Sequence, residues 1–366
     1  MKRLRLCLRW TLVLALAWIA FCSVIGILAS EYSLHPERRL LRPDSLAATR
    51  AIAERYHAKL VDVSILANDG VTLRAWSIQP LLDNGDAVIL LHGHTDNRAG
   101  MLGNAEPLLA HGYSVLLPDA RAHGASGGDL ATYGVKEADD VRRWFDWLQQ
   151  SESPRCIDGL GESMGAAQLL QSLRIAPGFC AIVAESSFAS FREASYDRMG
   201  EKLHTGAWAG RTLLRPVVEA GLLYARLKYG VDFEQASPEN AVAASRVPVL
   251  LIHGLKDTNL PPRHSEEIRA HASSRDSAVK LWEPAEAGHC GAAGAEPEEF
   301  TRRVIGWFQS HDPPQLAKNT EPCYHAPPQP GSVVYLGPRA ISIPTERRQP
   351  SCPPLPPSIS VPTPAD

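Results

Sequence analysis

A serine, a carboxylate and a histidine that are far apart in this chain have the residue types of a hydrolytic triad. A serine hydroxyl is a poor nucleophile at neutral pH, so a histidine must take its proton and a carboxylate must hold that histidine in the right tautomer. On an open α/β sheet, such a serine occupies the middle of a G-x-S-x-G turn between a strand and a helix. The chain contains this pattern twice, at residues 161–165 and 124–128. Ser163 and Ser126 are therefore the two candidate nucleophiles.

The residues around each serine favour Ser163. Residues 156–160 form a short apolar run that predicts a strand, and residues 164–170 predict a helix with small side chains where it approaches the sheet. Ser126 is followed by Gly128 and Asp129 with no sign of a helix start, which indicates a structural loop. We therefore predict Ser163 as the nucleophile.

The acid and the histidine are expected downstream of the serine, in that order. His289 lies in a glycine-flanked loop after the predicted strand 279–282, at the kind of strand end where catalytic groups of α/β sheets gather. Asp257 follows the predicted strand 247–252 in a tight loop. His253 ends the same strand, but it precedes the acid. The predicted catalytic residues are thus Ser163, Asp257 and His289.

Acyl transfer also needs two N–H donors aimed at the negative oxygen of the tetrahedral intermediate. We expect them from the backbone of Met164, directly after the nucleophile, and of His94, in the loop 91–97. The imidazole of His94 either lines the pocket or is a solvated loop side chain, whereas His92 is interpreted as bracing the loop. His92, His94 and Asp96 lack a fourth ligand for a metal site, so we predict no metal and no cofactor.

The elements that must position these residues follow a regular alternation. Short apolar runs and helical stretches alternate from residue 58 onward, which predicts an α/β fold with a mostly parallel central sheet and helices on both faces. Two runs joined by Asn-Asp-Gly at 68–70 predict a β-hairpin over residues 60–78. The further predicted strands are 87–91, 113–117, 156–160, 180–184, 247–252 and 279–282, and the predicted helices are 46–56, 99–110, 137–150 and 164–173.

Residues 187–245 interrupt the alternation and predict a helical cap. They are rich in helix formers and in large apolar side chains. A connection of this length inside a compact domain usually has its own structure and often a function, such as a lid. The alternative is extra helical packing on the outside of the domain.

The N-terminal residues predict a transmembrane signal-anchor. Residues 1–9 are basic, and residues 10–30 form an uncharged run that can span the ~30 Å hydrocarbon layer as a helix. This run is longer than the apolar core of a signal peptide, although small residues near Ala29 leave cleavage open. The positive-inside rule favours a single-pass protein of the cell (inner) membrane with a periplasmic catalytic domain, and arginines after the span weaken the asymmetry.

The remaining composition limits the other possibilities. Residues 31–57 are interpreted as a linker, and residues 313–366, with over half of the chain's 29 prolines, as a disordered tail. The seven cysteines form neither a close-spaced metal pattern nor an even set outside the anchor, so no disulfide framework is predicted. The net charge of −3 gives no sign of a nucleic-acid partner. The oligomeric state does not follow from the sequence.

Taken in order, five motifs make the chain similar to the α/β-hydrolase superfamily. They are LHGH at 91–94, DARAHGAS at 119–126, GESMG at 161–165, HGLKD at 253–257 and GH at 288–289. Within the superfamily, the chain resembles the bacterial serine-aminopeptidase-like and Bem46-like branches, which include esterases, thioesterases and peptidases. The resemblance implies an eight-stranded sheet over residues 58–312 with a cap after the sixth strand. It also implies a structural role for His123 and Ser126.

Three functions are compatible with these residues. The first is hydrolysis of a carboxylic ester or thioester through an acyl-enzyme on Ser163, with Asp257-oriented His289 as general base and acid. The apolar cap and the membrane anchor favour a small-molecule acyl or lipid-like substrate. The second is a peptidase or amidase with the same triad, because the leaving group meets the cap and not the triad. The third is a catalytically inactive, membrane-anchored interaction scaffold, against which the complete triad argues.

Overall fold

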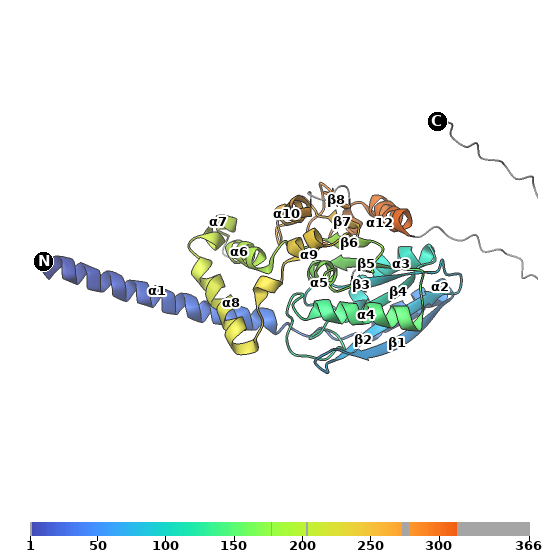
Figure 1. Cartoon of the computed structure of the whole chain (residues 1–366), viewed down its shortest axis with the longest axis horizontal. Helices are drawn as coiled ribbons and strands as arrows, with labels where there is room; N and C mark the ends of the chain where they lie inside the picture. Colours follow the sequence, from blue (N-terminus) through green and yellow to red (C-terminus); the bar gives the residue numbers. More distant parts are fainter. Residues whose placement is uncertain (1, 177, 203, 273–277, 313–366) are drawn as a thin grey trace, which may run out of the picture. The chain divides into compact units, whose positions relative to one another are not determined.

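An eight-stranded sheet forms the centre of residues 1–314, the first of the two compact units of the chain. The computed structural model describes residues 2–312 apart from 177, 203 and 273–277, so the predicted tail at 313–366 lies outside the described residues. The strands lie in the order β1-β2-β4-β3-β5-β6-β7-β8 (Figure 1). Their bounds are β1 (Ala58–Leu66), β2 (Thr72–Pro80), β3 (Asp86–Leu91), β4 (Ser114–Pro118), β5 (Cys156–Glu162), β6 (Ile182–Glu185), β7 (Val249–Ile252) and β8 (Val279–Trp282).

The sheet is mostly parallel, as predicted. β1 and β2 form the antiparallel hairpin, β2 is antiparallel to β4, and the strands from β4 to β8 pair in parallel. Strand β1, at the edge, alternates between half-buried and exposed residues, whereas every residue of β3, β6 and β7 is buried. Continuous apolar strands suit this arrangement because helices cover both of their faces.

Two separate hydrophobic cores occupy the two faces of the sheet. One core packs α4 (Glu137–Ser151), α5 (Met164–Ser172) and α10 (Arg263–Ala272) against the strands, with Trp144 and Leu169 among its buried side chains. The other packs α2 (Pro43–Arg55), η1 (Arg98–Met101), α3 (Leu102–Ala110), α11 (Ala292–Ala295) and α12 (Pro297–His311). The predicted α/β-hydrolase fold is therefore confirmed at the level of its layers and topology.

Several helices lie between β6 and β7, where the helical cap was predicted. They are α6 (Phe191–Lys202), α7 (Gly206–Arg211), α8 (Arg215–Tyr229), η2 (Phe233–Gln235) and α9 (Pro238–Ala244). Phe191 stacks on Phe233 with ring centroids 4.2 Å apart, and Tyr133 from the loop before α4 packs on Phe191 at 4.5 Å. These aromatic rings join the cap to the sheet domain close to the carboxyl ends of the strands.

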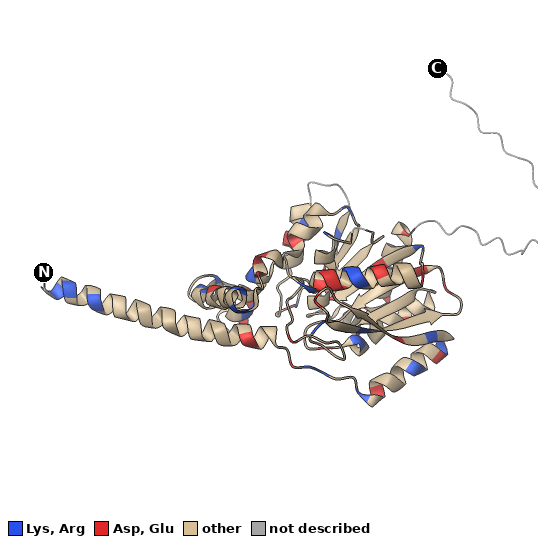
Figure 2. Cartoon of the chain, turned by 60° about the horizontal axis from the view of Figure 1, so that its bottom comes forward, with Lys and Arg blue, Asp and Glu red and all other residues tan. Residues whose placement is uncertain are grey.

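The N-terminal helix α1 runs from Lys2 to Leu34, beyond the predicted end of the anchor. Among the described residues, it is the one helix long and apolar enough to cross a membrane. Figure 2 shows basic residues at its start, a long stretch without charge, and an acidic residue near its end. Its last turn is tied to the sheet domain, because the N–H of Ala131 donates to the carbonyl of Leu34 and the hydroxyl of Tyr133 donates to the carbonyl of Ser33.

One disulfide links two neighbouring strands. Cys156 begins β5 and Cys180 lies just before β6, and their Cα atoms are 5.9 Å apart. This bond was not predicted from the sequence, because an odd number of cysteines outside the anchor does not indicate which of them meet. Of the described cysteines, Cys7, Cys22 and Cys290 are free.

Candidate active site

Ser163 lies in a tight turn between β5 and α5. Its φ of 51° and ψ of −112° fall in a region that non-glycine residues rarely adopt. The flanking glycines make this turn possible: a Cβ on Gly161 would lie 2.7 Å from the backbone of Gly165, and a Cβ on Gly165 would lie 2.3 Å from the carbonyl oxygen of Leu91. The N–H of Ser163 donates to the carbonyl of Glu185, which fixes the turn to the end of β6. The two glycines of the motif are thus required because other parts of the backbone come too close to them for a side chain.

The structure brings the three predicted catalytic side chains together. The Oγ of Ser163 lies 2.8 Å from Nε2 of His289, and Nδ1 of His289 lies 2.7 Å from Oδ2 of Asp257. Asp257 follows β7 and His289 follows β8, so all three side chains extend from the carboxyl edge of the sheet. This is the arrangement in which a histidine can deprotonate a serine while a carboxylate orients the ring.

Asp257 is held ionised by its surroundings. Burial raises its pKa, but hydrogen bonds from His253, His289 and the N–H of Leu260 outweigh burial and leave the pKa below its usual range. Its Oδ1 accepts hydrogen bonds from the N–H groups of Asn259 and Leu260, each at 2.9 Å. The carboxylate therefore keeps its charge and its orientation when the imidazole becomes protonated.

The two predicted N–H donors for an oxyanion belong to residues that border the cavity around Ser163. Met164 opens α5, and the first N–H groups of a helix have no partner within the helix. His94 lies in the loop after β3, and both residues line the same cavity as Ser163. The imidazole of His94 stacks on the ring of Tyr133 with centroids 5.4 Å apart. Burial lowers the pKa of His94 to about 4, so its ring is neutral at physiological pH.

A second set of residues positions the loop that carries His289, and sequence reasoning missed it. The carboxyl group of Glu185 accepts a hydrogen bond from the N–H of Ala292 at 2.9 Å, and the hydroxyl of Ser186 accepts one from the N–H of Cys290 at 3.1 Å. Glu185 is buried, and burial raises its pKa to about 8. No short motif marks these residues; only their place at the end of a parallel strand could have indicated them.

The other G-x-S-x-G serine has a structural role, as predicted. Ser126 is buried, its hydroxyl donates to the carbonyl of Asp119 at 2.7 Å, and it accepts from the N–H of Arg74 at 2.9 Å. Asp119 in turn forms a buried ion pair with Arg98 at 2.9 Å. These contacts fold residues 119–126 into a compact loop that does not reach the cavity around Ser163.

His92 and His123, two further histidines of the predicted motifs, also brace loops. Nε2 of His92 accepts a hydrogen bond from the N–H of Ala120 at 3.1 Å, and Nε2 of His123 accepts one from the N–H of Thr95 at 3.2 Å. Burial lowers the pKa of both rings, to about 3 for His123. Both rings are thus kept neutral, which leaves their Nε2 atoms free to accept these bonds.

A cavity of about 640 Å³ surrounds Ser163 and His289, within the size range of small-molecule sites. Its walls come from the cap and, unexpectedly, from the last turns of α1. Large apolar side chains, among them Phe188, Phe191 and Leu222, share these walls with Arg198 and Lys202.

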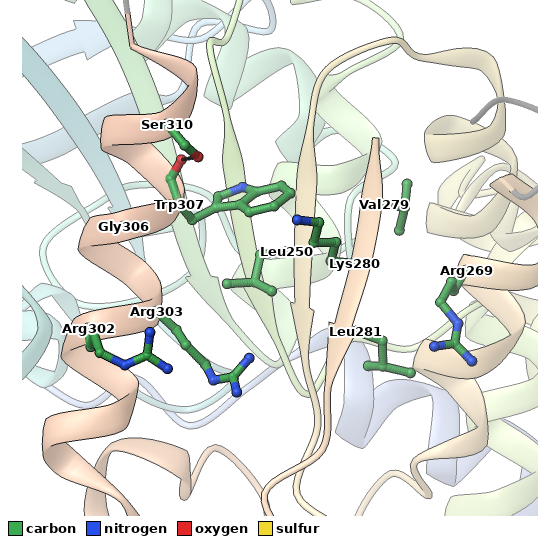
Figure 3. A pocket seen from close by; sticks show the side chains of 10 residues that line it. All are labelled: Leu250, Arg269, Val279, Lys280, Leu281, Arg302, Arg303, Gly306, Trp307 and Ser310. Carbon is green, nitrogen blue, oxygen red and sulfur yellow. Dashed lines mark hydrogen bonds between the residues drawn. The ribbon is translucent and has the colours of Figure 1, made fainter. Parts of the chain in front are cut away.

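A second cavity, of about 580 Å³, lies along β8 and α12, and Figure 3 shows the side chains that line it. It contains none of the three catalytic candidates. Lys280 lies over the ring of Trp307 at 5.5 Å, and Arg302 and Arg303 both donate hydrogen bonds to Glu299. This cavity is therefore a basic surface hollow at the edge of the sheet, separate from the site around Ser163.

Comparisons with known proteins agree with this geometry. A sequence profile described as "Alpha/beta hydrolase family" matches residues 88–303, a range that includes Ser163, Asp257 and His289. An uncharacterized protein of Bacillus subtilis, YqkD, is 28% identical over 202 residues, which cover 54% of this chain and 64% of YqkD. The matched part thus spans somewhat less than two thirds of that relative.

Two solved structures resemble the fold. The esterase Pf2001 of Pyrococcus furiosus is 27% identical with a TM-score of 0.60, and the match covers 77% of this chain and 99% of the esterase. The acylaminoacyl peptidase of Pyrococcus horikoshii is 16% identical with a TM-score of 0.53, over 69% of this chain and 42% of the peptidase. At that identity, the likeness to the peptidase concerns the fold alone.

Proposed function

The chain belongs to the alpha/beta hydrolase family, and from this premise we propose that it is a serine hydrolase that cleaves a carboxylic ester or thioester. The observation that carries the proposal is the continuous line of hydrogen bonds from Ser163 through His289 to Asp257, at 2.8 and 2.7 Å. Ser163 and His289 are both open to a cavity that can hold a substrate.

The proposed reaction has two halves. In the first, Oγ of Ser163 attacks the acyl carbon while Nε2 of His289 takes its proton, and the carbonyl oxygen becomes negative against the N–H groups of Met164 and His94. The carbon–oxygen or carbon–sulfur bond then breaks, and the leaving alcohol or thiol receives the proton from His289. In the second half, water replaces the leaving group and the acyl-enzyme is hydrolysed through the same proton transfers.

An ester or thioester suits the site better than a peptide. The esterase Pf2001 matches this chain over nearly its whole length at 27% identity, whereas the peptidase supports only the fold. The cavity walls include Phe188, Phe191 and Leu222, which can bury an acyl chain. The peptidase remains the second outcome of a substrate test.

We also propose that α1 anchors the protein in the cell membrane with the catalytic domain outside the cytoplasm. The basic residues before the uncharged run support this orientation. The disulfide between Cys156 and Cys180 supports it independently, because structural disulfides persist in oxidising compartments and are rare in the cytosol.

Active-site labelling followed by a substrate panel tests the function. A fluorophosphonate probe is expected to label the wild-type protein and not Ser163→Ala, and short-chain aryl esters are expected to be hydrolysed while aminoacyl amides are not. Amide cleavage at a comparable rate would favour the peptidase. Failure to label the wild type, beside a serine hydrolase that does label, would leave the scaffold as the better account.

A further inference from the structure

The last turns of α1 pack so closely on the cap helix α8 that the two backbones are in contact. A Cβ on Gly26 would lie 2.3 Å from the carbonyl oxygen of Val217, and a Cβ on Gly221 would lie 2.8 Å from the carbonyl oxygen of Gly26. Small residues that allow two helices to approach this closely are typical of helix packing in membranes. Five residues further along α1, the carboxylate of Glu31 accepts hydrogen bonds from the hydroxyls of Tyr224 and Tyr229 and from Lys228.

These contacts fix the depth of α8 relative to the uncharged run. Glu31 is the first charged residue after residues 10–30, and tyrosines and lysines commonly lie at the boundary between membrane and water. Gly26 lies within the run, roughly 6 Å below Ser30 at 1.5 Å per residue. When residues 10–30 span the hydrocarbon layer, the end of α8 that contacts Gly26 therefore lies at the acyl boundary.

The side of the cap that reaches this level exposes large apolar residues. Trp208 of α7 and Leu213 of the α7–α8 connection are 72% and 60% exposed, and Leu223 and Leu227 of α8 are 56% and 77% exposed. We call these four residues the cap face. Figure 1 shows α7 and the start of α8 on the side of the sheet domain from which α1 extends.

Basic residues flank the cap face. The side chains of Arg215 and Arg226 on α8 are 61% and 64% exposed, and each lies near one carboxylate, that of Glu219 at 3.7 Å and that of Asp232 at 3.9 Å. An apolar face with exposed basic neighbours is the pattern of helices that lie in the membrane interface, where the basic groups meet anionic lipids.

The active-site cavity is built from the same two helices. Gly26, Ala29 and Ser30 of α1 and Val217, Gly221 and Leu222 of α8 line the cavity that contains Ser163. This part of the cavity wall therefore lies at the level of the boundary between the acyl chains and the lipid headgroups.

From this continuity we propose that the cap face docks on the bilayer beside α1, and that the site hydrolyses the ester of a membrane-resident lipid with a long acyl chain, which reaches Ser163 from the membrane side. This inference rests on the proposed hydrolase function and on the anchor. It adds the partner, a phospholipid surface, and the substrate class.

Two substrates with the same leaving group test the proposal. The full chain is reconstituted in vesicles of phosphatidylcholine and the anionic lipid phosphatidylglycerol. Hydrolysis of 4-methylumbelliferyl oleate within the vesicles is compared with hydrolysis of 4-methylumbelliferyl acetate added from solution. Trp208→Glu/Leu213→Glu places two charges on the cap face, outside the cavity lining. We expect its oleate rate to fall at least tenfold while its acetate rate stays within twofold of wild type.

Leu81→Glu/Leu82→Glu is the matched control. These two leucines follow β2, are 77% and 88% exposed, and lie outside the cavity lining. The control is expected to keep both rates, which separates docking by the cap from a general effect of added charge on vesicle binding.

The outcomes are distinguishable. A cap-face variant that keeps the oleate rate overturns the docking proposal and leaves the hydrolase function standing. A wild type that hydrolyses neither ester overturns the proposed function itself. If the glutamate variant loses both rates through misfolding, Trp208→Ser/Leu213→Ser decides by the same ratio of oleate to acetate rates.

Discussion

Ser163 and Ser126 both occupy the centre of a G-x-S-x-G pattern, yet their surroundings differ in every contact that matters for chemistry. Ser163 has a φ of 51°, and its hydroxyl lies against the imidazole of His289 at the wall of a cavity. Ser126 is buried, and its hydroxyl both donates to Asp119 and accepts from the backbone of Arg74.

The difference lies in the elements that flank each serine. A strand enters the turn of Ser163 and a helix leaves it, so the hydroxyl projects from the sheet edge toward side chains from other strands. The turn of Ser126 returns to β2, where the N–H of Gly127 donates to the carbonyl of Thr72. The hydroxyl of Ser126 is held by hydrogen bonds to two backbone groups and is not free to act as a nucleophile. Whether a G-x-S-x-G serine can react therefore depends on the strand and helix beside it.

Alanine at each serine gives the largest expected contrast. Ser163→Ala removes the nucleophile, and we expect kcat on an aryl ester to fall by about 10⁶-fold, as when a triad serine is lost. Ser126→Ala is expected to keep kcat per folded molecule within a few fold. Steady-state kinetics on both variants check this, and comparable losses at the two positions would break the comparison.

The two buried aspartates that accompany these serines form the next contrast. Asp257→Asn leaves the imidazole of His289 without the carboxylate that sets its tautomer, and kcat should fall about 10⁴-fold. The unfolding free energy should change little by comparison, because an asparagine oxygen can still accept from Asn259 and Leu260.

Asp119→Asn should do the opposite. It leaves Arg98, which is 2% exposed, without its buried charged partner and with only the exposed carboxylate of Asp62 at 3.7 Å. Losing one member of a buried ion pair costs about 3–5 kcal/mol of stability. Chemical denaturation measures this loss, while kcat of the folded fraction should persist. An Asp119→Asn protein that is stable but inactive would contradict the division of roles.

Glu185 makes the stability of the Ser163 region depend on pH. Its pKa is about 8 in the folded protein because burial disfavours the charge, and near 4.5 when unfolded, so the unfolded chain binds fewer protons between these values. The contribution of Glu185 to the unfolding free energy should therefore be highest below about pH 4.5. It should fall as the pH rises to about 8. Glu185→Gln cannot ionise and should remove this fall, a relative gain of about 5 kcal/mol at pH 9.

Denaturant unfolding at pH 5, 7 and 9 measures the effect, with the exposed Glu54→Gln as the control. A difference between Glu185→Gln and wild type that does not grow with pH would show that Glu185 is ionised in the folded protein.

The smallest expected effect is on the stability of Ser126→Ala. The change leaves the N–H of Arg74 and the carbonyl of Asp119 each short of one buried hydrogen bond, which costs about 1–3 kcal/mol. The same unfolding experiment with Ser163→Ala should give a smaller change, because the hydroxyl of Ser163 borders a cavity. An equal loss in both would remove the distinction between a structural and a reactive hydroxyl.

The sequence was sufficient for the sheet and for the three triad candidates. The strands predicted at 87–91 and 247–252 were recognisable because each is a short apolar run. The order of serine, acid and histidine expected along the chain left few candidates for Asp257 and His289. Each of these signals is local, or depends on one known connectivity of the fold.

Contacts between distant segments could not be predicted in the same way. Nothing in the sequence around Glu185 or Ser186 indicates that they hold the backbone at 290–292, because the two strand ends meet only in the folded sheet. Gly26 and Ser30 on α1, and Gly221 and Ala225 on α8, are pairs of small residues four positions apart, a spacing that allows close helix packing. The spacing does not say which helix packs on which, so the contact between α1 and α8 was not predictable from it. The disulfide partners were ambiguous for the same reason.

The disulfide between Cys156 and Cys180 closes a covalent ring that contains the Ser163 turn and all of α5. A ring of this size restricts the unfolded chain and contributes roughly 3–4 kcal/mol in the chain-entropy view. Because neither sulfur belongs to the triad, a freshly translated copy that has not yet been oxidised would hold the same catalytic groups with a smaller margin against unfolding. Proteases that act on transiently opened chains would then remove such copies first, so the oxidation state of one bond would decide how long each copy survives.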